Sequence, residues 1–240
     1  MIRRIAAQAR LELALTLRRG ESLLVTIGIP VGILVFFTLV DVLPHPGRAV
    51  DFLTPGVLAL SVLSSAMTSL SISTGFERHA GVLRRLGTTP LGRTGLLAAK
   101  LAALAVVIAA QVAVVVGAAL LLGWGPRGAA WIEAAVVLTL GTAAFAGLGF
   151  LLAGRLRAET NLAVSNALFL IFLLTGGIVV PLSRLPDGAA AIARLLPAEP
   201  LATALREAFA SQGAGAGTFV TLAVWAIVTC GLAVRTFRWD

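Results

Sequence analysis

The chain has 240 residues, of which 58% are hydrophobic and only 12% are charged, and its mean hydropathy is +0.98. A water-soluble core cannot bury this much apolar surface, so the composition indicates an all-α integral membrane protein. The 19 Lys and Arg residues outnumber the 11 Asp and Glu residues, which gives a net charge of +8. These basic residues flank apolar runs and are not interleaved with aromatic residues, which argues against a nucleic-acid partner.

Residues 1–21 form a charged segment that precedes the first apolar run. Its apolar positions, Ile2, Ile5, Ala9, Leu13 and Leu17, step by three and four, with arginines beside them. The pattern predicts an amphipathic helix that lies on an anionic membrane surface. The segment is long and no small-residue cleavage pattern follows the apolar run, so we expect that run to stay as an anchor.

Six apolar runs meet the length of roughly 17 to 25 residues that a membrane-spanning helix needs. They cover residues 23–40, 53–74, 96–122, 131–153, 162–180 and 218–234. Six spans place both termini on one side, and 14 Lys and Arg residues fall on that side against five on the other. The positive-inside rule therefore predicts that both termini and residues 75–93 are cytoplasmic. Lys100, near the start of the third run, is expected to extend its charged end to the interface.

The outer segment 181–217 has a pattern unlike that of a plain loop. One apolar cluster consists of Ile192, Leu195 and Leu196, and a second of Leu201, Leu205 and Phe209. We predict two short helices that dip into the outer membrane face or lie on it, with Asp187 as the N-cap of the first.

The charged segment 75–93, GFERHAGVLRRLGTTPLGR, interrupts the apolar sequence between the second and third runs. Phe76, Ala80, Leu83 and Leu86 recur at helical spacing, and Gly87 is a typical helix end. The pattern predicts one short amphipathic helix, which is marginal alone in water. Its apolar stripe therefore needs the membrane interface or a protein partner to cover it, and a solvated loop that only sets topology is the weaker alternative.

Residue types that would support other functions are absent or separated. No Asp, Glu, Lys or Arg lies near the middle of a predicted span, which disfavours ion coupling. No Gly-x-x-x-x-Gly-Lys-Ser/Thr loop occurs, so the chain has no usual ATP site. His45 and His79 fall on opposite predicted sides, and no acidic cluster is suited to a metal, so we predict neither catalysis nor a cofactor in this chain. The single Cys230 lies in an apolar run and is interpreted as an inert thiol.

Mildly polar residues remain inside the predicted spans. We take seven of them as candidates for lining a path or a helix interface: Ser61, Ser64, Ser65, Thr68, Gln111, Asn161 and Asn166. Hydroxyl groups in membranes mostly pack helices or bond their own backbone, so helix packing is the simpler interpretation for the Ser and Thr residues. The three amides should face another helix or a cavity, because an amide facing lipid would have no hydrogen-bond partner.

Segment 75–93 resembles the cytoplasmic motif of ABC-2 type permeases, the membrane subunits of ATP-binding-cassette exporters such as the daunorubicin-resistance type. The resemblance rests on Phe76-Glu77-Arg78, Gly81, Leu83-Arg84-Arg85-Leu86, Thr88-Thr89-Pro90-Leu91, Arg93 and Lys100. It extends over the whole chain through the six spans, the N-terminal amphipathic helix and the outer helices.

The resemblance implies a single permease domain over residues 1–240, in which segment 75–93 holds a coupling helix that docks on a separate ATPase subunit. ATP and Mg would bind that partner, and the permease would work as a dimer, expected to be a homodimer, in the cell membrane and in contact with its lipids. The residues assigned to coupling are Phe76, Glu77, Arg78, Gly81, Leu83, Arg84, Arg85, Leu86, Thr88 and Pro90. The expected cargo is a hydrophobic or amphiphilic compound, a drug or a lipid, that leaves the cytoplasm or the inner leaflet.

Three other readings remain. An ion-coupled or passive carrier or channel would work without an ATPase, and a membrane enzyme would turn over a lipid on its own. A permease for haem, lipid or polysaccharide would share the architecture and differ only in cargo.

Overall fold

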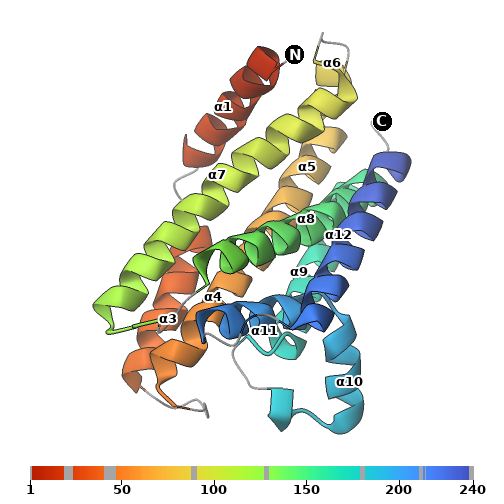
Figure 1. The fold of residues 1–240 in the computed structure, drawn as a ribbon. Helices are drawn as coiled ribbons and strands as arrows, with labels where there is room; N and C mark the ends of the chain where they lie inside the picture. The colour runs from red at the N-terminus through yellow and green to blue at the C-terminus, as the bar shows by residue number, and fades with distance from the viewer. Residues whose placement is uncertain are drawn as a thin grey trace.

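A computed structural model describes residues 2–18, 24–40, 47–87, 91–126, 130–178, 182–210, 213 and 215–237. Every regular element in these ranges is a helix, as Figure 1 shows. The predicted all-α integral membrane fold is confirmed, because the helices are long and apolar as well as numerous.

Five helical stretches are long and apolar enough to cross a membrane: Ala49–His79, Thr94–Leu121, Trp131–Arg155, Ala158–Thr175 and Ala216–Thr236. A shorter apolar helix, Thr26–Val40, lies at the position of the first predicted run. The elements are η1 (Leu24–Gly28) and α3 (Ile29–Val40), then α4 (Ala49–Val62), η2 (Leu63–Ser69) and α5 (Leu70–His79), then α7 (Gly92–Leu121), α8 (Trp131–Arg155), α9 (Ala158–Thr175) and α12 (Ala216–Thr236). Each of the six predicted runs thus coincides with a helical stretch in the described part of the chain.

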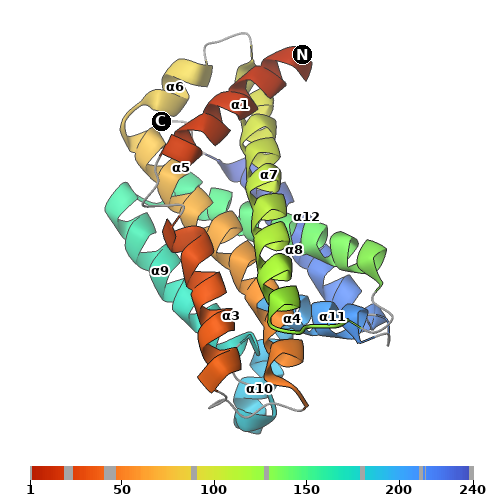
Figure 2. The ribbon, with the colours of Figure 1, turned by 90° about the vertical axis from the view of Figure 1, so that its left-hand side faces the viewer.

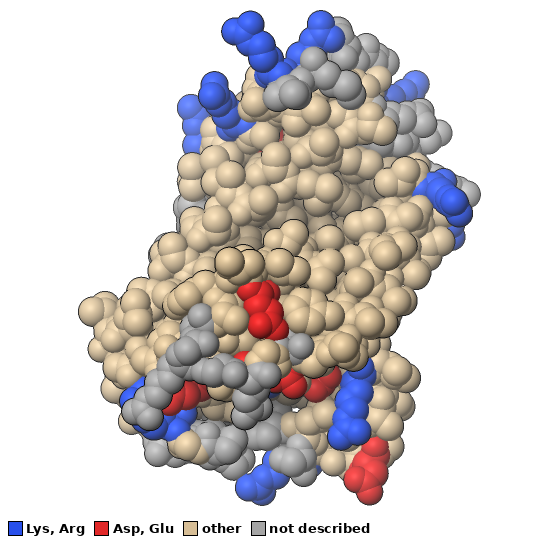
Figure 3. All heavy atoms as spheres, viewed as in Figure 1, with Lys and Arg blue, Asp and Glu red and all other residues tan. Residues whose placement is uncertain are grey.

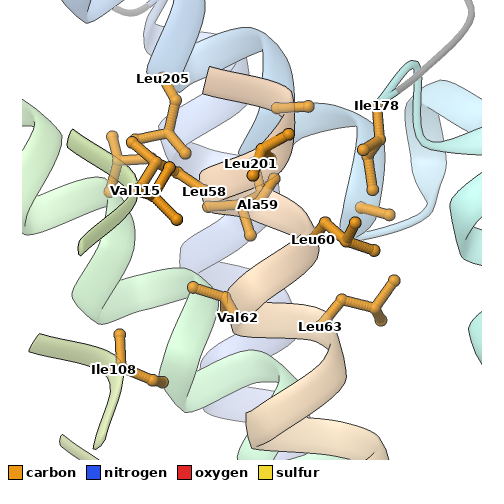
Figure 4. Packing of buried hydrophobic residues seen from close by; sticks show 14 of the residues in the cluster. Leu58, Ala59, Leu60, Val62, Leu63, Ile108, Val115, Ile178, Leu201 and Leu205 are labelled. Carbon is orange, nitrogen blue, oxygen red and sulfur yellow. The ribbon is translucent and has the colours of Figure 1, made fainter. Parts of the chain in front are cut away.

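The second stretch, α4–η2–α5, forms the centre of the bundle. Nearly all of α4 is buried, because its apolar residues are spread around the whole helix and other helices cover it on all sides. Leu58 and Val62 of α4 lie among Ile108 and Val115 of α7 and Leu201 of α11, as Figure 4 shows. Both η1 and η2 are π-helical, a local widening that is frequent at functional sites.

Helix α8 packs closely on its neighbours because glycines lie at the contacts. A Cβ atom on Gly147 would come 2.7 Å from the backbone nitrogen of Cys230 in α12. A Cβ atom on Gly149 would come 2.9 Å from the carbonyl oxygen of Ala66 in η2. Real Cβ contacts are essentially never this short, so these positions admit only glycine while the helices stay where they are.

One end of the bundle carries α1 (Ile2–Arg18), α6 (Val82–Gly87) and both described chain ends, as Figure 1 shows. We call this the α6 end. Helix α1 packs along α7, and Figure 2 shows the two helices crossing beside α6. The amphipathic helix predicted within residues 1–21 is therefore present over Ile2–Arg18.

The opposite end carries η3 (Leu182–Arg184), α10 (Asp187–Leu195) and α11 (Ala198–Phe209). The two helices predicted within residues 181–217 are thus present, and they differ in burial. Leu201 and Leu205 of α11 are fully buried against α4 and α8, whereas Ile192 and Leu195 of α10 are 62% and 71% exposed. Asp187 does not cap α10 as predicted, because it lies in the first turn and Pro186 takes the N-cap position without a side-chain hydrogen bond.

Arg206 joins α11 to the bundle. Its guanidinium lies 4.3 Å from the ring centre of Phe52 and donates a hydrogen bond to the carbonyl oxygen of Gly177. Burial lowers the pKa of Arg206 to about 10, and the charge of Glu199 opposes this shift. The side chain remains a cation at neutral pH and ties three elements together.

Charged side chains are distributed unevenly along the bundle. On the face drawn in Figure 3, Lys and Arg side chains stand at both ends of the bundle, whereas most of the visible Asp and Glu side chains lie toward the α10 end. The middle of this face is almost uncharged, as expected for a surface in contact with lipid tails.

Candidate functional site: the coupling segment and the membrane groove

The coupling segment, residues 75–93, consists of the end of α5, a turn, the six-residue helix α6 and the start of α7. The predicted single amphipathic helix is interrupted at Gly81, whose φ of 70° is in the left-handed region that favours glycine. Sequence periodicity missed the break because Phe76 and Ala80 continue the spacing of Leu83 and Leu86 across it. Thr88 and Pro90, both assigned to coupling, lie outside the described residues.

Helix α6 is held by its own chain. Leu83 is only 1% exposed and forms a small cluster with Leu91, the N-cap residue of α7, and Leu96 of α7. Leu86 and Ile5 of α1 pack against this cluster. A six-residue helix needs such support because it is too short to be stable alone. Leu83 thus anchors α6 within the chain, and Leu86 is half-buried against the same cluster, so their assignment to a partner contact stays a prediction.

The outward face of α6 is basic. Arg84 and Arg85 are exposed, while Arg78, at the end of α5, donates a 2.6 Å hydrogen bond to the carbonyl oxygen of Leu156. Arg78 thus fixes α5 to the connection between α8 and α9. The two exposed arginines are what α6 can offer to a charged partner.

Glu77 faces inward, to Lys100 of α7, with 2.6 Å between Oε2 and Nζ. The same ammonium lies 3.1 Å from Oε2 of Glu12 in α1, and the Lys100 side chain is only 3% exposed. Lys100 therefore does not extend to the interface as predicted, because two carboxylates from distant parts of the sequence reach it in the interior. We call Glu12, Glu77 and Lys100 the Lys100 cluster.

A groove of about 940 Å³ runs along the bundle between η1–α3, α4–η2–α5 and α9. Figure 2 faces the side of the molecule on which α3 and α9 lie. Most of the lining of the groove is apolar, and its polar lining includes Ser64, Thr68 and Asn166. The coupling segment contributes Phe76, which is 43% exposed, and Val82. We call this cavity the membrane groove.

Three of the seven candidate path residues, Ser64, Thr68 and Asn166, thus lie in the membrane groove. The other four, Ser61, Ser65, Gln111 and Asn161, are buried between helices. Of these four, Ser61 bonds its own helix, donating a 3.0 Å hydrogen bond to the carbonyl oxygen of Val57. Hydropathy could not separate the two sets, because both occur on apolar spans.

Gln111 of α7 connects the two π-helical segments. Its amide nitrogen donates to the carbonyl oxygen of Thr26 in η1, and its amide oxygen accepts from the hydroxyl of Ser65 in η2, both at 3.0 Å. The prediction that this amide faces another helix is confirmed.

Asn161 of α9 makes a similar link to α5. It donates to the carbonyl oxygen of Ser71 and accepts from the Ser71 hydroxyl, both at 2.8 Å, and Ser165 completes the group. These bonds satisfy a fully buried amide, as membrane interiors require. Within the described ranges no group of three or more His, Cys, Asp and Glu residues is placed to hold a metal ion.

In a comparison with known protein families, residues 5–210 match the family described as ABC-2 type transporter. The matched range includes α1 from Ile5 onward, the whole coupling segment and the three walls of the membrane groove. No curated protein sequence matches the chain.

Proposed function

Since the chain belongs to the ABC-2 type transporter family, we propose that it exports a hydrophobic or amphiphilic compound with energy from a separate ATPase subunit. The chain is a permease subunit of an ABC transporter and a multi-pass membrane protein. To this family membership the proposal adds the direction of transport, the class of cargo and the partner subunit. It also includes a location in the cell membrane with both termini in the cytoplasm, and it assigns the exporter to the daunorubicin-resistance type.

The observation that supports the proposal most directly is the continuity between the coupling segment and the membrane groove. Phe76 and Val82 line the groove, and they flank the turn that leads into α6 with its exposed Arg84 and Arg85. A subunit that binds these arginines and moves α6 would change the shape of the groove at the same time. ATP-driven closure of two such subunits would in this way rearrange the groove of each permease in a dimer.

The energy requirement supports a separate ATPase. Moving a two-state equilibrium from about 1:99 to about 99:1 takes roughly 5.5 kcal/mol. The sequence contains no phosphate-binding loop, so this energy must come from outside the chain if transport is active.

The lining of the groove supports the cargo class. Apolar side chains from three helices make up most of the wall, and a few hydroxyls, one exposed amide and the carboxylate of Glu77 provide hydrogen-bonding groups. Such a wall suits a drug or a lipid-like molecule with a small polar part. The groove would face the same groove of a second copy, so that two chains enclose the path.

The first test is to purify the tagged chain from its native membranes in mild detergent and to identify what accompanies it. We expect an ATP-binding subunit, and we expect Arg84→Glu to remove it, because the reversed charge repels the docking partner. Arg235→Glu, which reverses an exposed charge at the end of α12, is the matched control and should retain the subunit.

The second test uses inverted membrane vesicles with a fluorescent phospholipid analogue and an anthracycline as probes. ATP-dependent uptake of either probe, lost in Arg84→Glu and kept in Arg235→Glu, is the expected result. A chain that purifies alone and moves a probe without ATP would contradict the proposal and favour a carrier.

A further inference from the structure

The Lys100 cluster joins three elements that are far apart in the sequence. Glu12 lies in α1, Glu77 near the end of α5 and Lys100 in α7, and the ammonium of Lys100 contacts both carboxylates. A buried lysine is costly unless its charge is paired, and removing one member of such a group leaves the others uncompensated. The geometry of the cluster therefore depends on all three elements being in place.

A second contact also joins α1 to α7, and it includes α6 in place of α5. Ile5 of α1 packs on the apolar group formed by Leu83 of α6, the α7 N-cap residue Leu91 and Leu96 of α7. Ile5 and Glu12 are seven residues apart, about two helical turns, so they lie on the same face of α1. Two contacts on one face fix the direction of α1 as well as its position.

The cluster also adjoins the membrane groove. Glu77 lines the groove, and the carboxylate that Lys100 holds belongs to the helix that leads into α6. Displacement of α6 would therefore act on Glu77, and through Lys100 on Glu12 and α1.

We propose that Lys100 is a positioning residue that fixes α1 to the coupling segment, so that the N-terminal helix moves together with α6 during transport. The part of this inference that concerns transport rests on the proposed function. The attachment of α1 to α6 does not, and it can be measured without a partner subunit.

The attachment is tested with spin labels on cysteines introduced by Arg10→Cys in α1 and Arg84→Cys in α6, since both arginines are exposed. The single native cysteine is removed by Cys230→Ala, and the labelled chain is diluted with unlabelled chain in lipid nanodiscs. We expect a narrow distribution of distances between the two labels in this parent. Lys100→Met should broaden the distribution, and Glu12→Gln, which neutralises the carboxylate on α1 and leaves Glu77 in place, should broaden it as well.

Two further variants serve as controls. Leu101→Met changes a neighbouring residue of α7 that is exposed, so the distribution should stay narrow. Lys100→Arg keeps the positive charge and should restore most of the narrow component. An unchanged narrow distribution in both Lys100→Met and Glu12→Gln would overturn the inference.

The consequence for transport is measured on the complex of permease and ATPase. Lys100→Met leaves Arg84 and Arg85 in place, so the ATPase should still co-purify and hydrolyse ATP, while probe uptake falls by about tenfold or more because a buried charge pair is broken. Export at the parental rate in Lys100→Met would refute the role of Lys100 and leave the proposed function standing. Absence of an ATPase from the parent itself would refute the proposed function, and the label distances would still decide whether Lys100 fixes α1.

Discussion

Gly75 of α5 faces Asn161 of α9 with no room between them for a side chain. A Cβ atom at this position would lie 2.5 Å from the amide nitrogen of Asn161. That amide cannot turn away freely, because it is held by two hydrogen bonds to Ser71. The contact shows how a polar group and a glycine together set the spacing of two helices.

Gly75→Ala should therefore lower the stability of the folded chain by about 1–3 kcal/mol, the usual cost of inserting a methyl group into a packed site. The measurement is the apparent melting temperature in detergent, compared with Gly117→Ala, where nothing lies within 4 Å of the added Cβ atom. The control should melt at or slightly above the parental temperature. Equal melting of both variants would show that α5 and α9 are less closely packed than described.

At the scale of single residues, the sequence predicted the roles of the amides well and that of Lys100 wrongly. Burying an amide without a hydrogen bond is costly, so a buried amide needs a hydrogen-bond partner. Gln111 and Asn161 have such partners on neighbouring helices. Lys100 was expected at the interface because its carboxylate partners could not be identified. Glu12 is 88 residues away, and nothing in the sequence brings it close to Lys100.

At the scale of the element, Leu83 is the most buried side chain that α6 contributes to its packing. Leu83 supplies its central apolar contact to α7, while Val82 beside it is partly exposed and lies outside that small core. The periodicity of segment 75–93 predicted a short helix that needs a surface, and it missed the break at Gly81 that separates α6 from α5. It could not show that this surface is α7 of the same chain, because that contact depends on how α5 and α7 are placed by the rest of the bundle.

Leu83→Ala should loosen α6 while leaving the spans folded, because the contacts that hold the spans lie elsewhere. Trypsin should then cleave after Arg84 and Arg85 faster than in the parent, by roughly tenfold or more for the loss of about 2 kcal/mol or more of buried leucine contacts. Val82→Ala is the matched control and should be cut at the parental rate. If Leu83→Ala resists trypsin as well as the parent, α6 is held by contacts other than this core.

At the scale of the whole molecule, the placement of charge predicts the orientation in the membrane. The α6 end carries α1 with its arginines and both described chain ends, and the α10 end carries most of the acidic side chains visible in Figure 3. From the positive-inside rule we therefore predict that the α6 end faces the cytoplasm.

The orientation is measured in whole cells with a membrane-impermeant maleimide, in a background that carries Cys230→Ala. We expect Arg194→Cys, on α10, to be labelled from outside and Arg84→Cys, on α6, to be labelled only after the cells are opened. The opposite pattern would place the coupling segment outside the cell and would be incompatible with docking on a cytoplasmic ATPase.

The helical stretches differ in length along the same bundle. Helix α7 has 30 residues and is about 45 Å long, whereas the first stretch, with 17 described residues, is about 26 Å long. A hydrocarbon core of about 30 Å covers the short stretch fully and leaves part of α7 outside. Since Lys100 lies near the start of α7, lipids with longer acyl chains would bring the ion pairs around it closer to the tails. Acyl-chain length would then change the energetic cost of moving α1 and α6. The rate of transport would therefore depend on the thickness of the bilayer.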